Sequence, residues 1–265
     1  MLEVEGRPMR EVHATAVVDP TAELGAGVVV GPYAIVGPNV VVGEGCRIGA
    51  HAILERDTIL GAGCVIAPSA ALGGDPQDLK YRGEPTQLIV GERTVVREFA
   101  TLNRGTAAHG RTEVGSDCLI MAYAHVAHDC VLGDHVILSN AVNMGGHVQI
   151  EDWASVGGMT AVHQFVRIGA HAFIGGASQV RKDVPPYVKA AESPPKLYGL
   201  NAIGLERRGF PVEVRHELKR AYRLFFQSKL NISQALERAR DDLVLLPEVE
   251  HFIAFIEGSQ RGVTA

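Results

Sequence analysis

The chain repeats in units of six residues. From Val126 it reads VAHDCV, LGDHVI, LSNAVN, MGGHVQ, IEDWAS, VGGMTA and VHQFVR, so that an aliphatic residue or Met144 opens every unit. The same phase holds from residue 18 to residue 72, again at 90, 96 and 102, and then from 114 to 180 without a break. An internal repeat of this length constrains the fold more strongly than any local helix or strand pattern.

The period of six excludes a helix and favours short strands. Apolar residues six positions apart drift around a 3.6-residue turn, so no helix face can collect them. Glycine is frequent at the second position of a unit and small residues dominate the fifth, as tight turns between strands require. The repeat therefore predicts a mainly β protein, a parallel β-helix in which three units form each coil of a triangular prism. Successive coils would lie about 4.8 Å apart, with a period of about 18 residues.

Interruptions and a change of period indicate how the chain is divided. Polar segments punctuated by Gly and Pro break the repeat at about 73–88 and 103–113, and we expect them to leave the prism as loops. A proline-rich connection follows Val180, and from Pro211 the apolar spacing becomes helical, with Asn231 or Ser233 as a candidate cap. We expect a β-helix over residues 1–190 and a C-terminal domain of two or three helices over residues 191–265.

Composition narrows the class of protein. The 265 residues are 46% hydrophobic but only 6% aromatic, and the formal net charge of -5 argues against broad nucleic-acid binding. No apolar run approaches the roughly 20 residues of a membrane span, and MLEVEGRPMR lacks the apolar segment of a signal peptide. The cysteines all occupy fifth positions without CxxC spacing, which indicates packed small residues rather than metal ligands or disulfides. We expect a cytoplasmic protein.

The 18-residue period places His128, Gly146 and Gln164 in one column, with His147 and His163 one place to the side. A histidine titrates near neutral pH and can remove a proton from a hydroxyl and return it to a leaving thiolate. The backbone N–H groups of neighbouring glycines can hold an oxyanion. Because the sequence has no GxSxG motif, we expect direct transfer without a covalent enzyme intermediate.

Other readings of these histidines stay open. His51, His135 and His171 all occupy the fourth position of a unit, and we interpret them as structural. Zinc binding is an alternative for the rest, because the gamma-class carbonic anhydrases use the same kind of prism and share three histidines around one metal across a subunit boundary. A non-catalytic scaffold is a further alternative.

Four segments carry a specific resemblance. GDPQDLKYRGEPT, AHVAHDC, GGMTAVHQF and GLERRGF occur in this order, and over nearly the whole chain the sequence resembles the UDP-N-acetylglucosamine 3-O-acyltransferase family of hexapeptide-repeat acyltransferases. The resemblance implies a left-handed prism, although the usual rule for parallel crossovers would indicate the opposite hand.

The resemblance also implies a reaction and its partners. A homotrimer, with its site in the cleft between neighbours, would move a (3R)-3-hydroxyacyl chain from acyl carrier protein to the sugar 3-hydroxyl of UDP-N-acetylglucosamine. This is the first step of lipid A biosynthesis, and it needs no metal or other cofactor. A 3-amino sugar acceptor stays open as a variant of this reaction.

Residue roles follow from the same resemblance. His128 matches the general base, Asp129 beside it would orient the ring, and Gly146 matches the backbone donor of the oxyanion hole. The positions that match substrate contacts are Gln77, Asp78, Lys80, His125, His147, His163, Gln164, Asn201, Arg207 and Arg208. Guanidinium groups suit the diphosphate of the nucleotide because they present forked donors. Gly176 falls where the family measures the acyl tail, and a glycine there favours a longer chain of about 14 carbons. The bulkier Phe173, three residues earlier, favours a shorter groove instead, so the chain length stays open.

Overall fold

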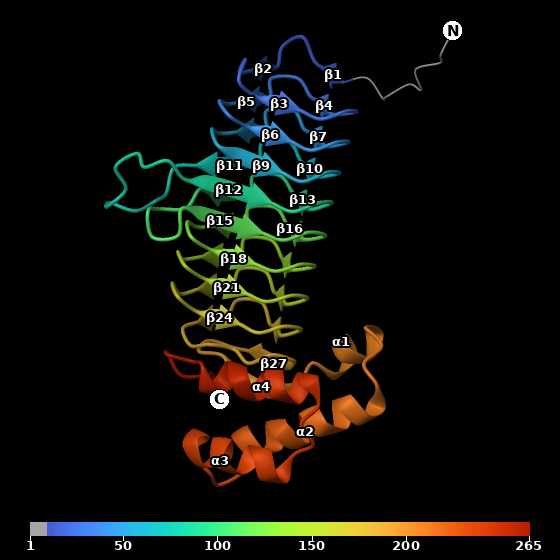
Figure 1. Ribbon diagram of the computed structural model, residues 1–265, viewed down its shortest axis with the longest axis vertical. Helices are drawn as coiled ribbons and strands as arrows, with labels where there is room; N and C mark the ends of the chain where they lie inside the picture. The colour runs from blue at the N-terminus through green and yellow to red at the C-terminus, as the bar shows by residue number, and fades with distance from the viewer. Residues whose placement is uncertain (1–9) are drawn as a thin grey trace.

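The structure is a computed structural model that describes residues 10–265. Residues 1–9 lie outside the described residues, and with them the start of the expected β-helix and most of the segment MLEVEGRPMR. Within the described range the strands form three sheets, which wind about one axis as a prism, with helices at its C-terminal end (Figure 1). The prism is a left-handed parallel β-helix, as the resemblance implied.

Each sheet takes one strand from every coil. Sheet A is built from β1 Glu11–Val12, β4 Val29–Val30, β7 Arg47–Ile48, β10 Val65–Ile66, β13 Val95–Val96, β16 Leu119–Ile120, β19 Ile137–Leu138, β22 Ser155–Val156, β25 Phe173–Ile174, β27 Val188–Ala191 and β28 Lys196–Leu200. Sheet B is built from β2 Val17–Val18, β5 Ile35–Val36, β8 Ile53–Leu54, β11 Ala71–Gly74, β14 Thr101–Asn103, β17 His125–Val126, β20 Asn143–Met144, β23 Ala161–Val162 and β26 Gln179–Val180. Sheet C is built from β3 Glu23–Leu24, β6 Val41–Val42, β9 Thr58–Leu60, β12 Gln87–Val90, β15 Arg111–Val114, β18 Val131–Leu132, β21 Gln149–Ile150 and β24 Arg167–Ile168.

The strand register follows the repeat. Val131 pairs with Gln149, and Gln149 pairs with Arg167, so each residue lies beside the equivalent one on the next coil. The loops at 75–86 and 104–110 add residues between strands that pair, so the paired residues lie further apart in the sequence there. Thr101, for example, pairs with His125. Because the register resumes after each loop, both insertions leave the inward-facing positions unchanged.

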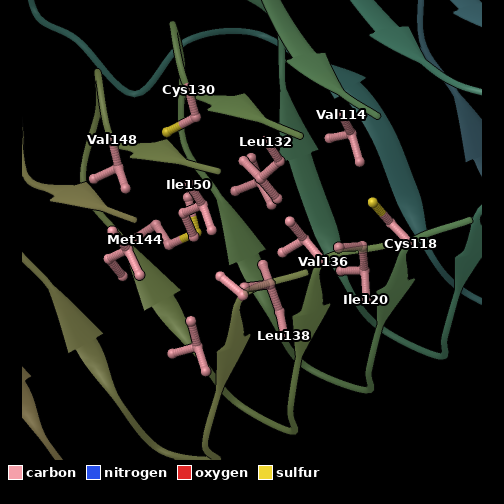
Figure 2. Packing of buried hydrophobic residues seen from close by; sticks show 14 of the residues in the cluster. Val114, Cys118, Ile120, Cys130, Leu132, Val136, Leu138, Met144, Val148 and Ile150 are labelled. Atoms are coloured by element: carbon pink, nitrogen blue, oxygen red, sulfur yellow. The ribbon is translucent and has the colours of Figure 1, made fainter. Parts of the chain in front are cut away.

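The core consists of the first and fifth residues of each unit. Leu132, Leu138 and Val136 point into the prism with almost no exposed surface (Figure 2). Cys118 and Cys130 are buried free thiols at fifth positions, and each donates a hydrogen bond to a glycine carbonyl of the next coil, at 3.2 and 3.3 Å. The thiols are packed small residues, as the sequence indicated.

The corners of the prism depend on a left-handed backbone at the fourth position of the unit. The φ angle is +59° at Asp129, +61° at His147 and +58° at His135. For a residue with a Cβ this conformation costs roughly 1–2 kcal/mol. Stacking along the corners offsets part of that cost, since the rings of His135 and Trp153 lie 3.8 Å apart and that of His171 follows. These contacts agree with the structural role expected for His135 and His171.

The segment after Val180 differs from the expected connection. β27 continues sheet A by pairing in parallel with β25, and β28 then returns antiparallel beside β27. The antiparallel return ends the ladder of parallel coils. The repeat could not reveal this hairpin, because neither strand keeps the phase of the hexapeptide units.

Helices cover the end of the prism. They are α1 Ala202–Arg207, α2 Val212–Phe226, α3 Ile232–Asp242 and α4 Pro247–Glu257. Asn231 caps α3 in a capping box with Gln234, which identifies it as the cap among the two candidates. The helix α1 was not expected, because six residues that include Gly204 give no clear helical spacing. In the part of the chain that the structure describes, no helix is long and apolar enough to cross a membrane.

A corner position tests the left-handed turns. Ala141 has a φ of +58°, and we expect Ala141→Val to lower the free energy of unfolding by about 1–2 kcal/mol, because a β-branched residue resists this conformation. Ala141→Asn, which tolerates it, should stay within about 0.5 kcal/mol of the wild type. Urea denaturation followed by circular dichroism measures both; equal losses would contradict the role of the corner.

Candidate active site

The candidate site lies at the corner where sheet B passes into sheet C, which we call the B–C corner. It comprises residues 127–130, 145–148 and 163–166 on successive coils. The N–H of His147 donates to the carbonyl of His128 at 3.0 Å, and the N–H of Phe165 donates to the carbonyl of Gly146 at 3.1 Å. These bonds fix the stacking that the 18-residue period predicted.

Both loops leave the prism at the same corner (Figure 1). The first loop, residues 75–86, joins β11 to β12, and the second loop, residues 104–110, joins β14 to β15. The first loop carries Gln77 and Lys80 with exposed side chains, and the carboxylate of Asp78 accepts the N–H of Lys80 at 2.9 Å. The fold therefore brings the predicted loop contacts to the side of the prism that holds His128.

His128 and Asp129 form a hydrogen-bonded pair. The Nδ1 atom of His128 lies 2.7 Å from Oδ2 of Asp129, whose side chain is fully buried. Burial raises the pKa of Asp129, but hydrogen bonds from His128 and Thr106 outweigh it and hold the pKa below its usual value. An ionised carboxylate only accepts hydrogen bonds, so Nδ1 carries the proton. Nε2 is then left to take a proton from a substrate.

Gly146 lies directly against the imidazole of His128. A Cβ at this position would lie 2.5 Å from Cε1 and 2.7 Å from Nε2 of His128, so any side chain would displace the ring. Across residues 10–265, no acceptor is hydrogen-bonded to the N–H of Gly146. A free backbone donor next to a basic nitrogen is the arrangement that an oxyanion hole needs.

Two further histidines flank the pair. The Nδ1 atom of His125 lies 2.7 Å from the hydroxyl of Thr101, and burial together with the charge of His128 lowers the pKa of His125. His147 meets the His128 ring edge-on at 5.2 Å, with its Nε2 3.7 Å from Oδ2 of Asp129. Burial lowers the pKa of His147, although the Asp129 charge opposes it. Both rings are therefore neutral near pH 7 and can donate or accept a hydrogen bond.

His163 and Gln164 lie on the coil beyond Gly146. The Nδ1 atom of His163 is 3.0 Å from the carbonyl oxygen of Gln164, and the guanidinium of Arg261 lies 3.2 Å from the same nitrogen. Arg261 comes from the C-terminal end of the chain and was not among the predicted site residues. The repeat holds no signal for it, because Arg261 lies outside the prism.

The remaining predicted residues lie elsewhere in the chain. Gly176 is at the corner between sheets A and B, where a Cβ would lie 3.1 Å from the carbonyl of Gly158. Asn201, Arg207 and Arg208 line a cavity of about 460 Å³ over sheet A. One chain therefore does not bring these positions to the B–C corner.

Asn201 and Arg208 make contacts of their own within the chain. The side chain of Asn201 caps α1 by accepting the N–H of Gly204 and also donates to the carbonyl of His171. The guanidinium of Arg208 lies over the ring of Trp153 at 4.9 Å, and burial lowers its pKa. Trp153 was not among the predicted site residues, because its corner position resembles those of the stacked structural rings.

The zinc alternative can be compared with the same geometry. Within residues 10–265, His128, Asp129 and His147 offer donor atoms that all lie within 4.8 Å of one another. Oδ2 of Asp129 already accepts hydrogen bonds from His128 and Thr106. A metal would have to replace these bonds, so the contacts favour a hydrogen-bonded catalytic pair over a metal site.

A parallel β-helix built from hexapeptide units is the fold of the hexapeptide-repeat acyltransferases. A family profile described as bacterial transferase hexapeptide (six repeats) matches residues 21–56, 39–74 and 111–146. A second profile, described as UDP N-acetylglucosamine O-acyltransferase, domain 2, matches residues 183–264. The chain belongs to the UDP-N-acetylglucosamine O-acyltransferase family.

Relatives that match over their whole length support this assignment. A protein from Myxococcus xanthus is 51% identical over 97% of this chain and 100% of its own, and one from Chlorobium phaeobacteroides is 61% identical over 96% and 97%. Both are named acyl-[acyl-carrier-protein]–UDP-N-acetylglucosamine O-acyltransferase. The solved structure of a UDP-N-acetylglucosamine acyltransferase from Bacteroides fragilis superposes with a TM-score of 0.94 at 38% identity, over 96% of this chain and 100% of that one.

His171 should make stability depend on pH. Burial, with the charges of Arg208 and His251, lowers the pKa of His171 to about 4, whereas an unfolded histidine titrates near 6.5. Between these values the unfolded chain binds a proton that the folded chain does not, so stability falls as the pH falls. After discounting for partial solvent screening, we expect a loss of about 1–2 kcal/mol between pH 7 and pH 4.

The variant His171→Asn tests this dependence, because asparagine tolerates the left-handed φ of +57° at this position. We expect its free energy of unfolding, measured by urea denaturation, to vary less steeply with pH between 6.5 and 4 than that of the wild type. His51→Asn, which changes an exposed corner histidine, is the control. If the slope of His171→Asn matches that of the wild type, His171 does not carry the effect.

Proposed function

We propose that the protein moves a (3R)-3-hydroxyacyl chain from acyl carrier protein to the 3-hydroxyl of UDP-N-acetylglucosamine, the first step of lipid A biosynthesis. The observation that carries the proposal is the pair formed by the half-buried His128 and the buried Asp129, with the free N–H of Gly146 against the His128 ring. The names of the relatives, which specify an acyl carrier protein donor and a UDP-N-acetylglucosamine acceptor, support the substrate assignment. No metal or other cofactor takes part in the proposed reaction.

The proposed reaction proceeds in two steps. Nε2 of His128 takes the proton of the sugar hydroxyl as its oxygen attacks the thioester carbonyl, and Asp129 stabilises the imidazolium that forms. The carbonyl electron pair moves onto oxygen, where the N–H of Gly146 donates to it. When the intermediate collapses, the C–S bond breaks and the imidazolium returns its proton to the thiolate of the carrier.

The surrounding residues would bind the substrates. His125 and His147, neutral near pH 7, can hydrogen-bond to sugar hydroxyls without adding a charge that would raise the cost of forming the imidazolium. His163 and Gln164 lie one coil further along and extend the contact surface. From the first loop, Gln77, Asp78 and Lys80 add polar contacts to the same corner.

We assign the residues that are remote from the B–C corner to the site through a homotrimer. In this proposal a neighbouring copy places Asn201, Arg207 and Arg208 at the nucleotide and Gly176 along the acyl chain, where an open groove favours about 14 carbons. Exposed apolar side chains on sheets A and B and on the corner between them support such contacts. They include Val17, Ile35, Phe99, Tyr123, Met159 and Phe173.

The organisation of the chain suits this reaction. Residues 1–190 would act as the catalytic β-helix and residues 191–265 as the helical domain. A cytoplasmic location, where acyl carrier protein is available, is part of the proposal.

Removing the base is the direct test. We expect His128→Ala to lose about two or more decades of activity, as removal of a general base predicts. The assay measures acyl transfer from a series of (3R)-3-hydroxyacyl carrier proteins to UDP-N-acetylglucosamine with EDTA present, and a parallel assay offers the 3-amino sugar nucleotide. The control is His51→Asn, because the His51 ring stacks on Tyr33 away from the B–C corner. This variant should keep full activity. An inactive wild type, or equal activity of wild type and His128→Ala, would overturn the proposal.

Gly146 offers a second test through a single methyl group. We expect Gly146→Ala to lower kcat by about a hundredfold, because the new Cβ would push the His128 ring out of place and shield the oxyanion donor. The matched control is Gly158→Ala at the equivalent position of another corner, where the Cβ would meet only the carbonyl of Asn140 at 3.0 Å. Steady-state kinetics distinguishes the two, and similar losses in both variants would count against Gly146.

A further inference from the structure

Part of the second loop is buried against the prism. Residues 104–106 are buried, whereas residues 107–109 are exposed. Gly105 allows this path, because a Cβ there would collide with the backbone of Arg111. The buried half of the loop therefore has a fixed position between the first loop and the B–C corner.

Thr106 holds the carboxylate of Asp129. Its N–H donates to Oδ1 at 2.9 Å and its hydroxyl donates to Oδ2 at 2.7 Å. Oδ2 is also the atom that accepts Nδ1–H of His128. Because Thr106 donates a hydrogen bond to each oxygen, it fixes the plane of the Asp129 carboxylate. It thereby fixes the direction in which Oδ2 meets the His128 ring.

The backbone of Asp129 is fixed from the same side. Its N–H donates to the hydroxyl of Thr112 at 2.8 Å, and Thr112 lies on β15, directly after the second loop. Both ends of Asp129 therefore depend on the path of residues 104–112. A change in this path would move the carboxylate away from Nδ1 of His128.

Arg104 connects the second loop to the first. Its guanidinium, only 2% exposed, donates to the carbonyl of Gly73, to the carboxylate of Asp75 and to the hydroxyl of Tyr81. Its backbone N–H donates to the carbonyl of Gly74 at 2.9 Å. Burying a guanidinium costs stability unless its donors are satisfied. Both terminal nitrogens of Arg104 are hydrogen-bonded, whereas its Nε has no partner among residues 10–265. The bonds of the terminal nitrogens anchor the start of the first loop and one residue within it.

Neighbouring residues complete the anchor. The side chain of Asn103 donates to the carbonyl of Asp75 at 2.7 Å. The N–H of Gly105 donates to the carbonyl of Gln87 at 3.2 Å, where the first loop rejoins the prism. Both ends of the first loop are thus tied to residues 103–105, which directly precede Thr106.

We propose that the second loop is a positioning device for the site, with Thr106 orienting the His128–Asp129 pair and Arg104 fixing the first loop, which carries Gln77, Asp78 and Lys80. The inference rests on the proposed function for its kinetic consequences but not for its structural ones. Neither residue touches the reacting atoms; each acts through the group that it holds.

The variant Thr106→Val tests the first half, because it removes the hydroxyl and keeps the size of the side chain. We expect kcat to fall by about tenfold or more with KM little changed, as for loss of a hydrogen bond to a charged group. Thr106→Ser should recover activity to within about threefold, since it restores the hydroxyl. The matched control is Thr94→Val, because Thr94 is also buried and its hydroxyl donates instead to the carbonyl of Gly115 at 2.8 Å.

A measurement without substrate separates this inference from the proposed function. In protein labelled with ¹⁵N-histidine, the wild type, Thr106→Ser and Thr94→Val should show His128 with its proton on Nδ1, and Thr106→Val should show a mixture of tautomers. If Thr106→Val and Thr94→Val agree in both the spectrum and kcat, the positioning role is wrong. If the spectra differ as expected while the wild type transfers no acyl group, only the proposed function fails.

The variant Arg104→Lys tests the second half by keeping the charge and removing the fork of donors. We expect the KM for UDP-N-acetylglucosamine to rise by about tenfold and trypsin to cut after Lys80 or Arg82 at least about fivefold faster, because the loop is released. Arg111→Lys, which changes an exposed arginine paired with Glu113, is the control. Unchanged cleavage and unchanged KM in folded Arg104→Lys, as judged by circular dichroism, would overturn the role of Arg104.

Discussion

The ladder of backbone hydrogen bonds between successive coils is the interaction on which the rest of the structure depends. It places each residue beside its equivalent on the next coil, as the N–H of Val131 donating to the carbonyl of Val148 and the N–H of Gln149 donating to that of Val166 illustrate. Because the register is fixed coil by coil, a column of outward side chains at a corner becomes a continuous surface. The histidines of the B–C corner meet for this reason, although they are many residues apart in the sequence.

The ladder alone does not make a catalytic pair. A carboxylate buried beside an imidazole needs further donors, since burial by itself would raise the pKa of Asp129 and favour its neutral form. Those donors come from outside the repeat, from Thr106 in the second loop. The regular coils thus provide the column of histidines, and the irregular segments provide the surroundings of the one that we propose as the base.

Much of this arrangement could be predicted from sequence, and the limits have physical causes. The period of six predicted the prism and the stacking of Gly146 on His128, and its two interruptions predicted the loops. The corner from which both loops leave was not predicted. The antiparallel return at residues 196–200 and the helix α1 were missed because neither follows a period. Thr106, Arg104 and Arg261 form their key contacts across loops and chain ends, where no spacing rule connects partners. The second loop was expected at about 103–113, yet Arg104 is buried within it and Arg111 already begins β15.

The left-handed turns also restrict which residues the site can contain. Asp129 occupies a fourth position with a φ of +59°, where aspartate and asparagine meet the lowest conformational penalty among residues with a carboxylate or amide side chain. A glutamate would add both a methylene and backbone strain. The same geometry that closes each coil thus narrows the sequences open to the partner of the histidine. Natural variation at this position would therefore be limited by the shape of the turn even before selection for activity acts on it.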